Sequence, residues 1–270
     1  MHKIFLASFF VLALCVAAFA QEFNGEKKED KPPTPQKIDF KKGLTTGDQV
    51  GEVAILICSN LMGRNGLNQI RKTTVETGKL KKYNADGTTV TTEYILSSIR
   101  SDKLLDEKIR MDQKAPDVAY ALVYKDDKVF GIYNDTAFSP RADAVAEFRS
   151  RIWHGLEALL RYKENGSTIT LDKEETILGV DFYVVTVTDK SDRKTTFYVS
   201  KKSYRVMMLT YEEDGVKYKR KFYDQKYPQG TLVPYRSVLW ADDKMVEEKD
   251  ISTITFGQTL DASIFNSPTP

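Results

Sequence analysis

The sequence has little of the residue types that most catalytic and metal centres use. Its 270 residues include only two histidines and two cysteines. His2 and Cys15 stand near the N-terminus, which leaves His154 and Cys58 for the rest of the chain. Zinc sites built from histidine, Ser-His-Asp triads and Cys-His pairs all need a well-partnered histidine. We interpret His154 as a surface or half-buried helix residue, and Cys58 as a small core residue without a disulfide partner.

Sequence motifs of common enzymes are absent as well. The chain contains no G-x-G-x-x-G, no P-loop, no G-x-S-x-G and no H-E-x-x-H. Its acidic runs, such as 172–175, contain lysine, which is typical of solvated strand faces. A secreted hydrolase is a weaker alternative that would need two carboxylates within about 10 Å of each other in a cleft. No such pair stands out, so we predict a protein that is not an enzyme and uses neither a cofactor nor a metal.

An excess of charge of one sign is also lacking. The chain has 40 lysines and arginines against 38 aspartates and glutamates. A nucleic acid or an anionic membrane surface as partner would require a clear basic excess. The segment 217–223 interleaves aromatic and basic residues, but we interpret it as the solvated outer face of a strand. We therefore predict no nucleic-acid partner.

A long apolar run occurs only at the N-terminus. After Lys3 comes an apolar run from Ile4 to Val16, interrupted only by Ser8, and Ala-Phe-Ala closes the segment. This pattern predicts a secretory signal peptide over 1–20. The run is shorter than the ~20 residues of a membrane span, and Cys15 does not follow the small residue that a lipidated cysteine requires. We predict export to the periplasm without a lipid anchor.

The residues after the signal peptide divide into a linker and a domain. Residues 21–45 are rich in charge and proline and have hardly any large apolar side chain. Such a segment cannot bury enough apolar surface to repay the entropy of ordering, which predicts a disordered linker. A single domain is expected over 46–270, long enough for one sizeable core.

Two helices are predicted in this domain. Over 46–62, apolar residues recur at helical spacing and also occupy other faces, which predicts a helix that is covered on most sides and ends at Gly63. A second, long helix is expected from Pro140 to Asn165. Gly155 would lie inside this helix, at a cost of about 1 kcal/mol relative to alanine. Such a glycine indicates close packing against the helix backbone.

Most of the remaining domain reads as strands joined by tight turns. Successive hairpins predict an antiparallel meander, and a sheet of this size curls rather than staying flat. The fold class is therefore α+β, mostly β: a curled antiparallel meander, with two or more helices covering its concave face. The expected strands lie in 67–100, 107–113, 120–133, 167–177, 180–188, 194–200, 204–211, 216–223, 233–241 and 244–256.

Three segments, in this order, carry a resemblance to a known family. An apolar helix runs into "GLNQIRKTTVETGKL" (66–80). Then follow "ILGVDFYVVTVTDKSDRKTTFYVSKKSYRVMMLTY" (177–211) and a closing "ITFGQTLDASIFNSP" (254–268), with its L-D-x-x-x-F ending. The chain resembles the LolA-like periplasmic lipoprotein carriers, also called outer-membrane lipoprotein-sorting proteins. The likeness covers 46–265, although the linker is long for such a carrier.

The resemblance implies a half-barrel with helices in its mouth and an apolar cavity for acyl chains. The implied function is a non-enzymatic periplasmic carrier or binder of lipid or lipoprotein acyl chains, active in outer-membrane trafficking. The alternative is an envelope sensor or scaffold of the same fold that binds a protein partner and no lipid. Candidate cavity residues, for each of which a plain core role is the more common alternative, come from both helices and from strands: Ile57, Leu61, Ile152, Trp153, Leu156, Phe182 and Trp240.

Two further features follow from the resemblance. In the carriers a strand arginine helps to hold a lid shut. Its counterpart here could be Arg71, Arg100 or Arg110, and no motif distinguishes the three. The C-terminal pair Ile264 and Phe265 is expected to fold back and pack against the barrel edge, or else to serve as a plain core anchor.

Overall fold

The structure is a computed structural model that describes residues 47–268. The predicted signal peptide (1–20) and linker (21–45) lie outside the described residues, and the domain boundaries therefore stay predictions. Within residues 47–268, no helix is long and apolar enough to cross a membrane.

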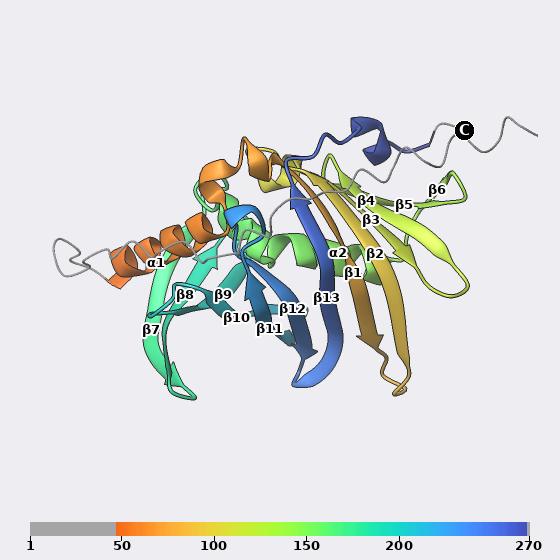
Figure 1. The fold of residues 1–270 in the computed structure, drawn as a ribbon. Coiled ribbons are helices and arrows are strands. Elements are labelled where there is room, and N and C mark those ends of the chain that lie inside the picture. The colour runs from red at the N-terminus through yellow and green to blue at the C-terminus, as the bar shows by residue number, and fades with distance from the viewer. Residues whose placement is uncertain (1–46, 269–270) are drawn as a thin grey trace, which may run out of the picture. The chain divides into compact units, whose positions relative to one another are not determined.

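Thirteen strands of the described region form one open antiparallel sheet, as predicted (Figure 1). The first meander comprises β1 (Thr73–Tyr83), β2 (Thr89–Ile99), β3 (Lys108–Lys114), β4 (Ala119–Lys125), β5 (Lys128–Tyr133) and β6 (Thr136–Phe138). The second comprises β7 (Thr168–Ile177), β8 (Val180–Thr188), β9 (Lys194–Ser200), β10 (Val206–Glu213), β11 (Val216–Lys226), β12 (Val233–Ala241) and β13 (Lys244–Phe256).

The two meanders join at the centre of the sheet. Strand β1 pairs with β13 in antiparallel register from Thr74 opposite Phe256 to Lys82 opposite Glu247. The edges are consequently β6 and β7, which do not pair with each other. The sheet curls into a half-barrel, and the segment that connects its two edges crosses the concave face (Figure 1).

Short turns set the register of the hairpins. Asp126 and Asp127 between β4 and β5, and Asp242 and Asp243 between β12 and β13, all have positive φ. Two successive residues of positive φ match the twist of the strands that flank a two-residue hairpin loop, and aspartate tolerates this conformation.

The helices cover different parts of the concave side. Helix α1 (Gly47–Leu61) lies against β7, β8 and β9, whereas α2 (Ala142–Trp153) lies below the middle of the sheet (Figure 1). Helix α1 ends close to the predicted position, and Gly63 follows with φ of 91°. Short 3-10 turns complete the chain: η1 (Arg64–Gly66), η2 (Ile70–Lys72), η3 (Leu104–Asp106), η4 (Leu156–Arg161), η5 (Pro228–Gly230) and η6 (Ala262–Phe265).

The prediction of one long second helix was wrong. Helix α2 ends at Trp153, and the chain is extended at Gly155 (φ −78°, ψ 165°) before it enters η4. A side chain at Gly155 would bring its Cβ within 2.5 Å of the Arg151 carbonyl oxygen. The glycine therefore permits a sharp kink between α2 and η4, a role different from mid-helix packing.

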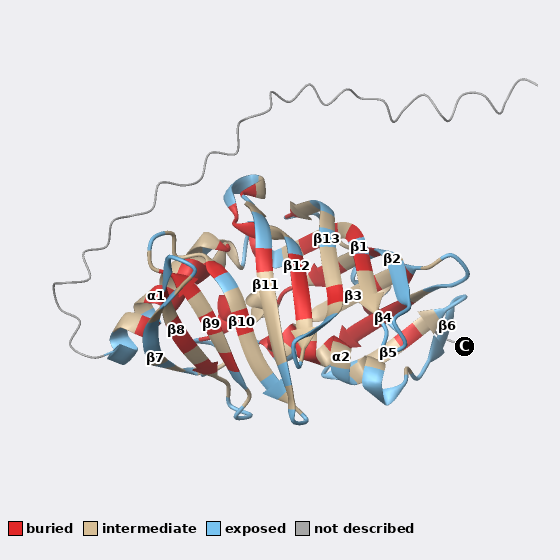
Figure 2. Cartoon of the chain, turned by 90° about the horizontal axis from the view of Figure 1, so that it is seen from below, coloured by how far each residue is buried: buried red, intermediate tan, exposed pale blue. Residues whose placement is uncertain are grey.

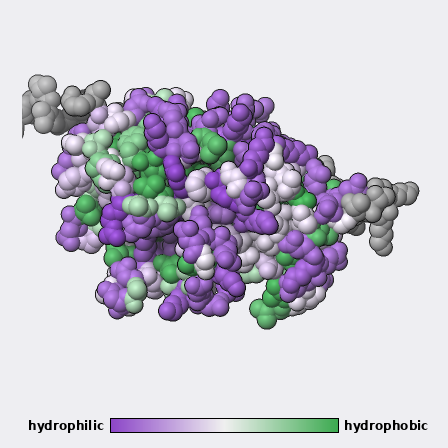
Figure 3. All heavy atoms as spheres, turned by 180° about the vertical axis from the view of Figure 1, so that it is seen from behind, coloured by the Kyte–Doolittle hydropathy of each residue, from purple (hydrophilic) through white to green (hydrophobic). Residues whose placement is uncertain are grey.

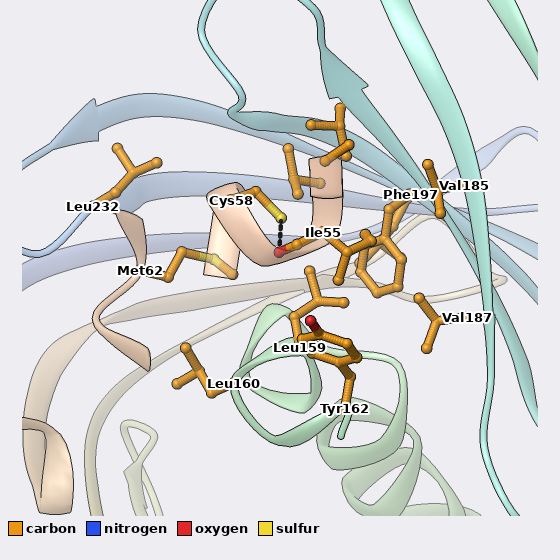
Figure 4. Close-up of a cluster of buried hydrophobic side chains, with 14 of the residues drawn as sticks. Ile55, Cys58, Met62, Leu159, Leu160, Tyr162, Val185, Val187, Phe197 and Leu232 are labelled. Atoms are coloured by element: carbon orange, nitrogen blue, oxygen red, sulfur yellow. Dashed lines mark hydrogen bonds between the residues drawn. The ribbon is translucent and has the colours of Figure 1, made fainter. Parts of the chain in front are cut away.

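The core has two parts, with buried residues along the strands on both sides of α2 (Figure 2). One part packs α1 and the η4 segment against β8, β9 and β10, and Figure 4 shows Ile55, Cys58 and Leu159 meeting there. Burial raises the pKa of the Cys58 thiol to about 12, and the thiol donates to the Ile55 carbonyl. Cys58 is thus the core residue that was predicted. The other part packs α2 against β1 to β5.

The C-terminal turn η6 packs on β3 and β4, which are interior strands. Phe265 is fully buried, and Arg110 donates to the Ile264 carbonyl oxygen at 2.8 Å. Because Ile109 and Met111 line the concave side, Arg110 between them faces the convex side. The expectation that this pair packs against the barrel edge was wrong, since it anchors the chain to the back of the sheet.

Candidate functional site

A cavity of about 200 Å³ lies between the α2–η4 segment and the concave face of the sheet. Strands from both meanders line it, so the β1–β13 joint passes over it. Its apolar wall includes Leu96, Ile109, Met111, Phe148, Ile152 and Leu156. Apolar side chains dominate, and the polar groups among them are mostly charged.

A second hollow, the outer groove, has a volume of about 980 Å³ and runs between α2 and the strands β10 to β13. Ser150, Arg151, Tyr211 and Arg220 line both the groove and the cavity. The cavity therefore borders the groove along the inner side of α2. Seen from behind, the surface is mostly polar and its apolar residues are scattered (Figure 3).

Five charged residues form an ion-pair network at one end of the cavity, here called the arginine–glutamate cluster. Arg71 Nη2 donates to both oxygens of Glu157 at 2.9 and 3.0 Å, and Arg100 Nη2 lies 2.6 Å from Glu157 Oε2. Arg100 Nη1 lies 3.6 Å from Glu107 Oε1, which also pairs with Arg161. Glu157 on η4 is thus tied to η2 and to the end of β2.

The pKa values of the two carboxylates in this cluster are shifted in opposite directions. Burial raises the pKa of Glu107, and the nearby Arg100 and Arg161 offset it only in part. Burial also acts to raise the pKa of Glu157, but Arg100 and Arg71 together lower it to about 2. Glu157 is therefore a carboxylate that holds the α2–η4 segment to the sheet at neutral pH.

A second network closes the other end of the cavity. Glu247 on β13 is buried and pairs with Arg151 of α2 and, at 2.9 Å, with Arg220 of β11. Burial acts to raise the pKa of Glu247, and Arg151 and Arg220 lower it to about 2. Arg151 also pairs with Glu147, one turn earlier on α2.

His154 lies at the end of α2, and its predicted half-exposed position was wrong. Its side chain is 3% exposed, its Nδ1 lies 2.6 Å from Thr195 Oγ1, and its ring stacks on Tyr211 at 4.1 Å. Burial, assisted by the positive charge of Arg193, lowers the pKa of His154 to about 4. A neutral, hydrogen-bonded histidine in this position fixes the end of α2.

Two of the seven predicted cavity residues, Ile152 and Leu156, line the cavity. Trp153 faces the outer groove, with the Arg193 guanidinium 3.9 Å from its ring. The remaining four lie elsewhere. Ile57 and Leu61 are half-buried residues of α1, Phe182 meets Tyr198 edge-on, and Trp240 lies beneath Lys219 and Lys221.

The structure separates the three candidate arginines. Arg71 and Arg100 line the cavity, whereas Arg110 binds the C-terminal turn on the convex side. Sequence reasoning missed their partners Glu107 and Glu157. The available signal was a single glutamate inside the apolar run Leu156–Leu160. In residues 47–268, no three His, Cys, Asp or Glu side chains gather as a candidate metal site.

The architecture is an open antiparallel half-barrel with a helical segment across its concave face. No protein-family model and no curated protein matches the sequence. Among solved structures, the chain is similar to a DUF1329 family protein from Desulfovibrio piger, at 15% identity with TM-score 0.63, covering 82% of this chain and 98% of that one.

Two other solved structures share the fold. One is described as an outer membrane lipoprotein-sorting protein domain from Vibrio parahaemolyticus: 16% identity, TM-score 0.56, 80% of this chain and 97% of that one. The other is a LolA superfamily protein from Nitrosomonas europaea: 13% identity, TM-score 0.55, 77% and 97%. The chain has a LolA-like fold, as the resemblance in the sequence predicted.

Proposed function

We propose that the protein is a non-enzymatic periplasmic binder or carrier of lipid or lipoprotein acyl chains. The observation that carries this proposal is the apolar cavity enclosed between the α2–η4 segment and the concave sheet. An acyl chain of about fifteen methylenes gains roughly 12 kcal/mol on leaving water. A carrier across an aqueous compartment therefore needs an apolar space that closes around its cargo.

The structure fits the closed state of such a carrier. Pockets for drug-sized ligands measure about 300–1000 Å³, so a cavity of about 200 Å³ holds only part of an acyl chain. Enlargement requires the α2–η4 segment to move away from the sheet. Ion pairs of Glu157 and Glu247 hold this segment in place. In an open state, water molecules can solvate the separated charges. The kink at Gly155 is the natural hinge.

The hydrolase alternative finds weaker support. Glu107 and Glu157 both lie near Arg100, and their pKa values are shifted in opposite directions. Such a pair is the starting point for acid–base catalysis. However, each carboxylate is bound by two arginines, Glu107 is 1% exposed, and the neighbouring wall is largely apolar. These carboxylates are better suited to closing the cavity than to activating water.

Native mass spectrometry with lipid extraction tests the proposal on the exported protein, purified from a bacterial periplasm without detergent. We expect bound lipid or acylated peptide, and its loss in Leu156→Asp, which places a charge in the cavity wall. Leu178→Asp is the matched control, since Leu178 is 97% exposed and far from the cavity lining. A clean mass with no uptake on incubation with lipid would overturn the carrier function and favour a protein-binding scaffold.

A further inference from the structure

The arginine–glutamate cluster contains three arginines and only two glutamates. A further carboxylate that acts on Arg161, Glu164, is already paired with Arg64 at 2.7 Å. One positive charge at this end of the cavity therefore lacks a carboxylate of its own among the described residues.

The excess charge coincides with unused hydrogen-bond donors. Arg71 is 2% exposed, and its Nε and Nη1 have no hydrogen-bond acceptor within the described part of the chain; the same holds for Arg100 Nε. The guanidinium of Arg71 lies 4.2 Å from the centre of the Phe256 ring, which covers its face and leaves its edges for an acceptor. Buried donors without acceptors are costly, and those of a charged group more so.

The network at the other end of the cavity differs in this respect. Arg151 and Arg220 share Glu247, and neither has a buried donor without an acceptor in residues 47–268. The mismatch between donors and acceptors is thus found at the arginine–glutamate cluster, where it involves Arg71, Arg100 and also Nη1 and Nη2 of Arg161, and not at the Glu247 network. Of these three arginines, Arg71 and Arg100 are the two that bind Glu157 of the α2–η4 segment.

We infer that the ligand carries an anionic group, a carboxylate or a phosphate, that replaces the Glu157 carboxylate between Arg71 and Arg100. The inference rests on the proposed function, because the apolar part of the same ligand fills the cavity. When the α2–η4 segment moves, Glu157 leaves both arginines. An anion with two or more oxygens then pairs with the two guanidinium forks and also reaches the unused donors.

This site narrows the ligand class. A fatty acid or an acidic lipid combines an alkyl chain with an anionic end. The acyl groups of a lipoprotein are esters and amides, which bring no negative charge to the arginines. Anion exchange at Glu157 therefore favours free acidic lipid over lipoprotein as cargo.

The test compares ligands that share one alkyl chain. Palmitate, hexadecanol and hexadecyl phosphate are offered in competition to the delipidated exported protein, and the bound fraction is read by native mass spectrometry. Hydrogen bonds to charged groups lead us to expect about tenfold or tighter binding of an anionic ligand over the alcohol. The ratio of palmitate to hexadecyl phosphate identifies the anion.

Two variants separate the role of the cluster from general damage. Arg71→Met should reduce the preference for palmitate over hexadecanol, whereas Arg236→Met, on the outer face of β12, should leave it unchanged. Glu157→Gln should raise palmitate affinity by about tenfold, because it removes the competing carboxylate while both arginines remain. A thermal melt checks that each variant is folded. If Arg71→Met does not fold, the palmitate affinity of Glu157→Gln alone tests the anionic site.

The outcomes distinguish failure of the anionic site from failure of the proposed acyl-chain binding. Equal binding of all three ligands, or weaker palmitate binding by Glu157→Gln, overturns the anionic site and leaves the acyl-chain binder intact. Binding of none of the three overturns both.

Discussion

At the scale of single residues, buried ionisable groups make stability depend on pH in two separate windows. Glu157 and Glu247 have pKa values of about 2, below the ordinary 4.5, so their contribution is present above pH 4.5 and disappears as the pH falls towards 2. His154 affects stability at a higher pH than the two glutamates. Its pKa is about 4 in the folded protein against 6.5 unfolded, so only the unfolded chain takes up its proton between these values.

We therefore predict that His154 lowers the free energy of unfolding by up to about 3 kcal/mol as the pH drops from 6.5 to 4, and that Glu107, whose pKa is raised in the folded protein, offsets part of this loss. The fall comes from protonation of unfolded His154, because Thr195 and Tyr211 enclose its neutral ring in the folded state. His154→Asn should flatten the profile in this window and keep the steeper loss at lower pH. Denaturant titrations at a series of pH values measure both. An equal slope of wild type and His154→Asn between pH 6.5 and 4.5 would contradict the assignment.

The sequence analysis predicted the burial of a residue where it depends on neighbours in the chain, but not contacts with residues far along the chain. Cys58 was correctly placed in the core, because its neighbours are apolar at helical spacing. His154 was misplaced, since its burial depends on Thr195 and Tyr211, which lie far along the chain. The link between Glu157 and Arg71 spans 86 positions, and no local pattern encodes such a pairing.

At the scale of elements, the kink at Gly155 decides how the helical segment crosses the sheet. Ile152 and Leu156, the candidate cavity residues on either side of the kink, both line the cavity. The helix itself was predicted too long. Helical spacing continues past Gly155 in the sequence and does not reveal the kink, at which a Cβ would lie 2.5 Å from the Arg151 carbonyl oxygen.

Because of this contact, we expect Gly155→Ala to lower the free energy of unfolding, although alanine usually stabilises a helix relative to glycine. Alanine in a continuous helix would stabilise the protein by about 1 kcal/mol relative to glycine. At the kink, we predict a loss of about 1–3 kcal/mol in the free energy of unfolding, because the new methyl group overlaps the Arg151 carbonyl. Ala146→Gly, at an exposed position within α2, is the reference for ordinary helix propensity. Urea titration compares the two, and a stabilised Gly155→Ala would show that α2 and η4 can join.

At the scale of the whole molecule, local hairpins were predictable and their assembly was not. Turn residues and alternating strands predict a curled meander, and the sheet confirms it. Nothing local indicates that the chain forms two meanders, or that β1 lies beside β13 at the centre. That pairing joins segments far apart in sequence, and the sequence analysis did not predict it.

The β1–β13 joint carries the final prediction, because it holds the two meanders together above the cavity. Its register shifts between Thr77 and Gly78, and a Cβ at Gly78 would overlap the Asp250 carbonyl oxygen of the partner strand. Since backbone atoms on both sides would have to separate, we predict that Gly78→Ala lowers the free energy of unfolding by about 3 kcal/mol.

Gly87→Ala provides the comparison for Gly78→Ala. Gly87 lies in the β1–β2 turn with positive φ, and a Cβ there meets no atom within 4 Å. Its replacement costs only the local conformational strain, about 1–2 kcal/mol. Hydrogen exchange of Gly78→Ala should show faster exchange in β1 and β13 than in β8 and β9, because the damage begins at the joint. If both variants lose the same stability and β1 stays protected, the two meanders are held together chiefly by the α2–η4 segment, and opening that segment for a ligand would then loosen the whole half-barrel.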